Sequence, residues 1–97
     1  MRPVGLADVE MAARVLMRVA PHARQELMQQ IIWQTEEADR FRLAQAAPHA
    51  LYGVGSLMSC AARRQAAPRP DALGADALHA FSVVFLALIS RATDQSP

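Results

Sequence analysis

The stretch that decides the fold lies between residues 21 and 45 and reads PHARQELMQQIIWQTEEADRFRLAQ. At about 100° per residue its apolar side chains form one continuous stripe, which is typical of an amphipathic helix. Pro21 suits the first turn of a helix, and Pro48 disfavours helical backbone at the residue before it. We therefore predict a helix over 21–46. Its inner stripe contains Leu27, Met28, Ile31, Thr35, Ala38, the aliphatic stem of Arg42 and Gln45, with Phe41 at the edge.

Trp33 is the unusual residue of this helix, because helical spacing places it among the polar residues of the opposite side. A large aromatic ring in that position needs a contact partner. One interpretation is that the segment containing Leu51, Tyr52 and Leu57 folds back and buries Trp33 in the core. The alternative is that Trp33 anchors another molecule, as aromatic residues do at interfaces. The core interpretation is the one we expect.

The last apolar segment has hydrophobic residues on almost every side, and such a helix is central either to a core or to an interface. We expect it to pack along the inner stripes of the first two helices, which Pro21 joins into a hairpin.

Asp8, Ser56 and Asp76 (or Asp71) are the predicted N-caps. The sequence thus predicts one all-α domain over 1–97, a compact bundle of about four helices. Its expected parts are an arm (1–6), helices over 7–19, 21–46, 56–65 and 75–92, an exposed linker (66–74) and a frayed tail (93–97).

Composition excludes several classes of protein. The 97 residues are 53% hydrophobic, but many of these are alanine, so we expect the core to rest on larger apolar side chains. A net charge of +1 gives no long-range field. The single cysteine rules out an internal disulfide, and the most hydrophobic stretch, 80–90, is about half as long as a membrane span. We expect a soluble, cytoplasmic protein with no membrane partner.

The residues that could carry chemistry do not converge in the sequence. No His, Cys or carboxylate pattern has metal-ligand spacing, and Gly53-Val54-Gly55-Ser56 lacks the lysine and the preceding strand of a phosphate loop. We interpret it as a glycine connector with a serine cap. Cys60 is expected to be a small buried thiol, and the carboxylates Glu36, Glu37 and Asp39 a solvated face. The sequence therefore predicts no catalytic residue, no cofactor, no metal and no enzymatic activity.

Two sets of residues are candidates for binding. Arg63, Arg64 and Arg69 could contact phosphate, although no aromatic residue is interleaved with them in the sequence as a single-strand platform requires. Large apolar residues on the second and last helices are candidates for protein contacts. These interaction candidates are Trp33, Ile32, Tyr52, Phe81 and Phe85.

Several short motifs carry a resemblance. The chain is similar to a family of short, uncharacterised helical proteins of alphaproteobacteria through Asp8-Val9, Ala12-Ala13-Arg14, Glu36-Glu37-Ala38-Asp39, Pro48-His49 and Gly53-x-Gly55-Ser56-Leu57-Met58 with Ala61-Ala62. Tyr52 stands where that family usually has Trp. The family has no established activity, so the resemblance implies no catalytic residue. More loosely, the helical hairpin resembles the small terminase subunits of phage-like particles, which assemble into rings, but no basic recognition helix is evident.

The expected function is that of a non-enzymatic protein–protein interaction module that self-associates into a homo-oligomer. The alternative is a DNA-packaging adaptor of the small terminase kind, for which nucleic acid would be the partner.

Overall fold

The computed structural model describes residues 1–94, and these form helices without any β-strand. The helices pack against one another, so the all-α prediction is confirmed. A single turn of 3₁₀ helix, η1 (Pro21–Ala23), precedes the second helix. The four α-helices are α1 (Leu6–Leu16), α2 (Arg24–Gln45), α3 (Leu57–Ala61) and α4 (Ala75–Asp94).

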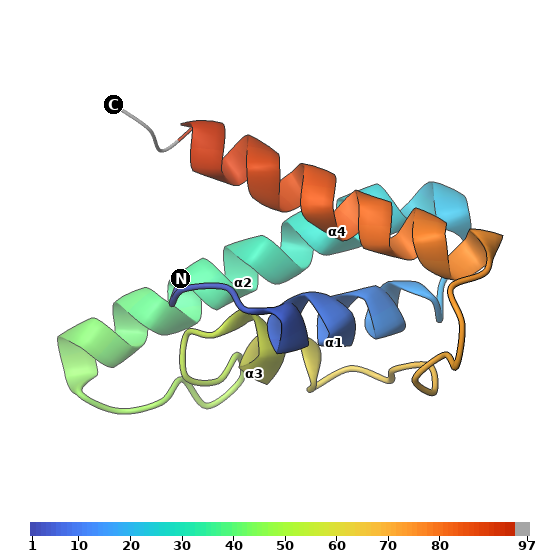
Figure 1. Cartoon of the computed structure of the whole chain (residues 1–97). Helices are drawn as coiled ribbons and strands as arrows, with labels where there is room; N and C mark the ends of the chain where they lie inside the picture. Colours follow the sequence, from blue (N-terminus) through green and yellow to red (C-terminus); the bar gives the residue numbers. More distant parts are fainter. Residues whose placement is uncertain (95–97) are drawn as a thin grey trace.

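The helices are arranged around α1 (Figure 1). The chain turns at η1, and α2 runs back along α1, which gives the predicted hairpin. The last helix, α4, lies across both α1 and α2, while α3 packs on α1 and α2 from the other side. The N-terminal arm lies against α2 and the glycine connector, because the Met1 amino group pairs with Asp39 (2.9 Å) and the Arg2 amide donates to the Gly55 carbonyl (2.8 Å). The arm therefore joins α2 to the glycine connector.

Two of the predicted helices are shorter in the structure, and the last one is longer. Residues 17–19 do not continue α1. The amides of Arg18 and Val19 donate to the carbonyls three residues earlier, for example Val19 N to Leu16 O (3.1 Å). The third helix has five residues, and only turns follow it over 62–64. In contrast, α4 continues to Asp94, into the part of the tail predicted to fray. Positions 95–97 of that tail lie outside the described residues.

Of the predicted N-caps, Ser56 is confirmed and two are wrong. The Ser56 hydroxyl accepts from the Ser59 amide (3.2 Å). Asp8 lies inside the first turn of α1, where one carboxylate oxygen accepts from the Gly5 amide (2.8 Å) and the other from the Met58 amide (2.9 Å). It therefore also binds the start of α3 to α1. Asp76 is the second residue of α4, and its carboxylate binds Arg24.

The core differs from the expected one because small residues dominate it. Alanine side chains of all four helices are buried, and no aromatic ring is. Alanine at a contact lets two helix axes approach closely, so small side chains fill the centre while several large ones remain outside. The buried side chains that pack together in this core are Val9, Ala12, Ala13, Val15, Leu16, Met28, Ile31, Leu57, Cys60, Ala61, Ala80 and Val84.

Candidate interaction surfaces

The largest apolar surface of the chain lies on α4. This helix buries only Ala77, Ala80 and Val84. On its outer side Leu78, Phe85, Leu86 and Ile89 are between 45% and 65% exposed. We call these four residues the α4 face.

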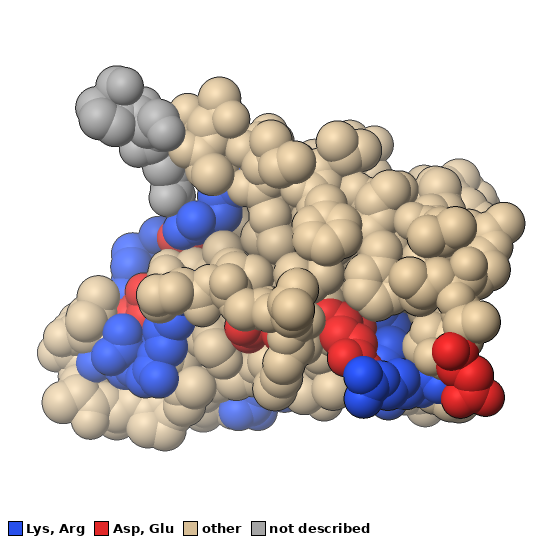
Figure 2. All heavy atoms as spheres, viewed as in Figure 1, with Lys and Arg blue, Asp and Glu red and all other residues tan. Residues whose placement is uncertain are grey.

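No Asp, Glu, Lys or Arg occurs over 77–90. In Figure 2 the surface over most of α4 is accordingly free of charged side chains, which lie mainly below it. The predicted contact of α4 with the first two helices exists, but its fully buried residues are small. Phe81, Val83 and Leu88 are only partly buried beside them, and the α4 face points outward.

Hollows border α4 on both sides. One, of about 240 Å³, is lined by Leu6, Leu73 and the rings of Phe81 and Phe85, with Arg69 at its edge. A second, of about 220 Å³, lies between α2 and α4 at Gln25 and Leu86. Two more open hollows, at Gln29–Ile32–Arg91 and at Val19–Leu27, have volumes of about 320 and 580 Å³. The sequence candidates Phe81, Phe85 and Ile32 thus line surface depressions next to α4.

By length and composition α4 is also the one helix of the described part of the chain that could cross a membrane. Its most apolar 18-residue window has a mean hydropathy of 1.4, and 17% of that window is buried. One such helix is weak evidence, because core helices of soluble proteins can have the same composition. The sequence-based expectation used 80–90 alone, whereas the helix that contains this stretch has 20 residues. The expected absence of a membrane partner stays a prediction.

Trp33 is not in the core, so the expected burial is wrong. Its side chain is 57% exposed. Leu57 is buried elsewhere and Leu51 points to solvent, so only Tyr52 covers part of the indole, edge-on at 6.4 Å between ring centroids. His49 stacks on the other side of Tyr52 at 4.6 Å and is itself in edge contact with Phe41.

The predicted phosphate contacts separate into two places. Arg69 pairs with Glu10 (3.0 Å) beside the start of α4. Arg63 donates to the Ala50 carbonyl (3.3 Å), and Arg64 donates to the Gln34 side-chain oxygen (2.7 Å). Arg64 thus binds the residue next to Trp33, and Arg63 binds a carbonyl two residues before Tyr52, so both arginines are anchored to the segments that carry these two rings. The sequence around Arg63 and Arg64 contains no aromatic residue, and the fold supplies Trp33 and Tyr52 from other segments.

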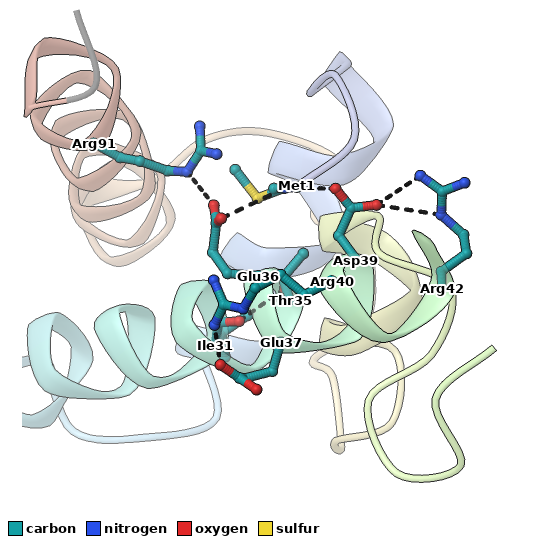
Figure 3. Close-up of polar contacts among 9 residues, drawn as sticks. All are labelled: Met1, Ile31, Thr35, Glu36, Glu37, Asp39, Arg40, Arg42 and Arg91. Carbon is teal, nitrogen blue, oxygen red and sulfur yellow. Dashed lines mark hydrogen bonds and ion pairs between the residues drawn. The ribbon is translucent and has the colours of Figure 1, made fainter. Parts of the chain in front are cut away.

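The three carboxylates Glu36, Glu37 and Asp39 of α2 are ion-paired and do not form a solvated face, contrary to expectation. Figure 3 shows the α-amino group of Met1 between Glu36 and Asp39, at 3.6 and 2.9 Å, with Arg91 of α4 on the other side of Glu36. Arg42 binds Asp39 (2.7 Å). The hydrogen bond from the Met1 amino group, followed by that from Arg42, lowers the pKa of Asp39 from its ordinary value of 3.8.

The family model for a domain of unknown function, DUF7742, matches residues 2–88. The chain belongs to the DUF7742 family. No curated protein and no solved structure gives a significant match to this DUF7742 domain.

The residues of this DUF7742 domain that could do chemistry have structural partners. Cys60 is buried as predicted, and its thiol points to the Ile31 carbonyl (3.7 Å). His49 accepts from the Leu51 and Tyr52 amides and fixes the connector. Over the described residues, no three His, Cys, Asp or Glu side chains come together as metal ligands.

Sequence reasoning missed Arg24, whose side chain is buried between three elements. It donates to the Leu16 carbonyl (2.9 Å), to the carboxylate of Asp76 (2.7 Å) and to Nδ1 of His79 (2.9 Å). The guanidinium thereby joins the end of α1 to the start of α4. Helical spacing could have found it, because Arg24 lies four residues before Met28 on the buried stripe.

Proposed function

We propose that this DUF7742 domain is a non-enzymatic interaction module that self-associates through α4. The observation that carries the proposal is the α4 face, a row of large aliphatic and aromatic side chains that α1 and α2 leave uncovered. Contiguous apolar surface bordered by polar residues is typical of protein interfaces. Burial of one such side chain contributes about 1.5–3 kcal/mol, so a few of them can drive association.

The order of residues on α4 supports a second copy of the chain as the partner. Leu78, Ser82, Phe85 and Ile89 follow one another at alternating spacings of four and three residues, as in the seam of a helical coiled coil. Two such helices in antiparallel orientation place Leu78 opposite Ile89, and Ser82 opposite Phe85. The small hydroxyl side chain then leaves room for the ring. A two-fold axis repeats both contacts, which closes the dimer.

Analytical ultracentrifugation of the whole chain over a range of concentrations tests the proposal. We expect a monomer–dimer equilibrium that Ile89→Glu shifts to monomer, because a carboxylate would lose its hydration in the seam. Leu43→Glu is the matched control, since Leu43 is 70% exposed near the far end of α2. A chain that stays monomeric at high concentration, or whose α4 binds lipid vesicles and not a second copy, contradicts self-association.

The second candidate function is the DNA-packaging adaptor that the resemblance to small terminase subunits implies. It is favoured by Arg14, Arg18, Arg63 and Arg64, none of which pairs with a carboxylate within residues 1–94. Arginines without an acidic partner are available to phosphate. A gel-shift titration of duplex DNA at low salt separates the two candidates, because only the adaptor requires a shifted band.

A further inference from the structure

Nine of the ten arginines of this chain fall into two groups, and only Arg2 belongs to neither. Five of them pair with carboxylates: Arg24, Arg40, Arg42, Arg69 and Arg91. Four others bind only neutral oxygens among the described residues. These are Arg14 on the Ala67 carbonyl (2.7 Å), Arg18 on Gln65 (3.1 Å), Arg63 on the Ala50 carbonyl (3.3 Å) and Arg64 on Gln34 (2.7 Å).

The second group is concentrated in one part of the fold. Arg63 and Arg64 belong to the segment 63–67, and Arg14 and Arg18 of the α1 end bind to that same segment. Their positive charge is therefore not neutralised locally and is held close to one short stretch of backbone. We call these four residues the free arginine row.

The row comes nearest to Trp33 and Tyr52 at Arg63 and Arg64, which bind Ala50 and Gln34 in the segments that carry the two rings. Trp33 offers an exposed indole, and Tyr52 supports its edge. Tyr52 is held in turn by the ring of His49 and by the paired hydrogen bonds of His49 with Gly53 (2.8 and 3.1 Å). The indole is thus presented on a rigid backing, which reduces the entropy lost when a flat ligand stacks on it.

We propose that the free arginine row and Trp33 bind single-stranded nucleic acid, with the guanidinium groups on phosphates and a base stacked on the indole. A positively charged track with an exposed aromatic ring is the arrangement by which single strands are bound without sequence preference. Arginine suits phosphate because its planar fork donates two parallel hydrogen bonds.

The surface itself favours a single strand over an acidic protein segment. None of the four hollows described above is lined by Trp33, Tyr52 or the free arginine row. A base needs no pocket, because it can stack on the open ring face.

A second copy of the chain supplies little complementary charge, because most of its carboxylates are already bound. Glu10, Glu36, Glu37, Asp39 and Asp76 are in ion pairs. The anion that fits the row therefore comes from another molecule, and this site does not depend on association through α4.

Trp33 is the only tryptophan, so its fluorescence reports on the site directly. A titration of the whole chain with an oligothymidylate at low salt should quench the indole emission. Increasing salt should reverse the quenching, with a log–log slope of about −0.7 for each phosphate bound. No quenching, with no rise in the anisotropy of a labelled oligonucleotide, overturns the proposal. Equal or stronger quenching by polyglutamate overturns the choice of nucleic acid.

Variants locate the site. Trp33→Leu should lower the affinity for the labelled oligonucleotide by roughly 10- to 100-fold, and Trp33→Phe should keep most of it, because stacking needs a ring. The double variant Arg63→Gln/Arg64→Gln should weaken binding and reduce the salt slope. Arg69→Gln/Arg40→Gln removes the same charge from paired arginines and should change little. If both double variants lose affinity equally, binding follows net charge alone and the proposed site is wrong. Circular dichroism confirms that each variant is folded.

Discussion

Gly55 lies at a position where the fold does not tolerate a side chain. Its φ is +91°, a left-handed conformation that side chains disfavour, and a Cβ there would lie 2.8 Å from the Cα of Asp39. We expect Gly55→Ala to lower the free energy of unfolding by about 1–3 kcal/mol from the backbone alone, and by more because α2 must move.

Urea unfolding followed by circular dichroism measures this effect of Gly55→Ala. Gly74→Ala is the control, since no atom lies within 4 Å of a Cβ at position 74. A similar loss of stability in both variants would contradict the close packing of the connector against α2.

Arg24 is the second residue on which stability depends at this scale. Its guanidinium donates hydrogen bonds to oxygens of Leu16 and Asp76 and to a ring nitrogen of His79 at the same time. A lysine ammonium is a compact charge and cannot reach three directions with fixed geometry. We expect Arg24→Lys to cost about 1–3 kcal/mol of unfolding free energy.

The matched control for Arg24→Lys is Arg69→Lys, whose side chain is 77% exposed. Exposed ion pairs contribute little to stability, so its unfolding midpoint in urea should be unchanged. Equal midpoints for the two variants would show that the buried contacts of Arg24 contribute nothing to stability.

Helical spacing predicted the burial of Met28, Ile31, Thr35 and Ala38, and all four are buried. Helical spacing failed to predict burial where a charged residue occupies a position on the buried stripe. Arg24 continues the same stripe but is charged, and its burial becomes favourable only when partners from two other helices are present. The exposure of Trp33 likewise depends on how much of its ring the connector covers. Tertiary packing determines that coverage, and helical spacing in the sequence does not.

At the scale of the element, the sequence could predict that α4 is a helix but not which face it buries. Apolar residues surround it, so any side could have faced the core. The structure buries the side with Ala77, Ala80 and Val84, because small side chains permit close contact with α1 and α2. Leu78, Phe85, Leu86 and Ile89 remain outside and form the α4 face on which the proposed self-association depends.

Disulfide trapping tests the antiparallel orientation of that association. In an antiparallel pair Leu78→Cys of one copy lies beside Ile89→Cys of the other, so a mixture of the two variants should cross-link. Each variant alone should not, because eleven residues separate the positions by about 16 Å along the helix, beyond the Cα separation that a disulfide spans. The native Cys60 is buried and does not compete. Cross-linking of Leu78→Cys with itself would indicate parallel helices and contradict the proposed register.

At the scale of the whole molecule, one ionic network connects segments far apart in the chain. The Met1 amino group, Glu36 and Asp39 of α2, and Arg91 of α4 are in direct contact (Figure 3). This network could not be predicted from the sequence, because a terminal amine and a carboxylate 38 positions away have no periodic relation. Its contribution to stability should depend on pH.

Asp39 provides the pH dependence. The hydrogen bonds from Met1 and Arg42 stabilise the charged carboxylate and lower its pKa in the folded state. A group whose pKa is lower in the folded chain stabilises the fold above its unfolded pKa, and this contribution is lost as pH falls through the folded value. We expect Asp39→Asn to be less stable than wild type by about 1–3 kcal/mol at pH 6, with the difference shrinking below pH 4. Urea unfolding of both proteins from pH 6 to pH 2.5 measures this difference.

The control is Glu37→Gln, which removes an exposed ion pair with Arg40 and should follow the wild-type curve closely. A difference between Asp39→Asn and wild type that stays constant down to pH 2.5 would show that the Asp39 carboxylate is not stabilised by these contacts.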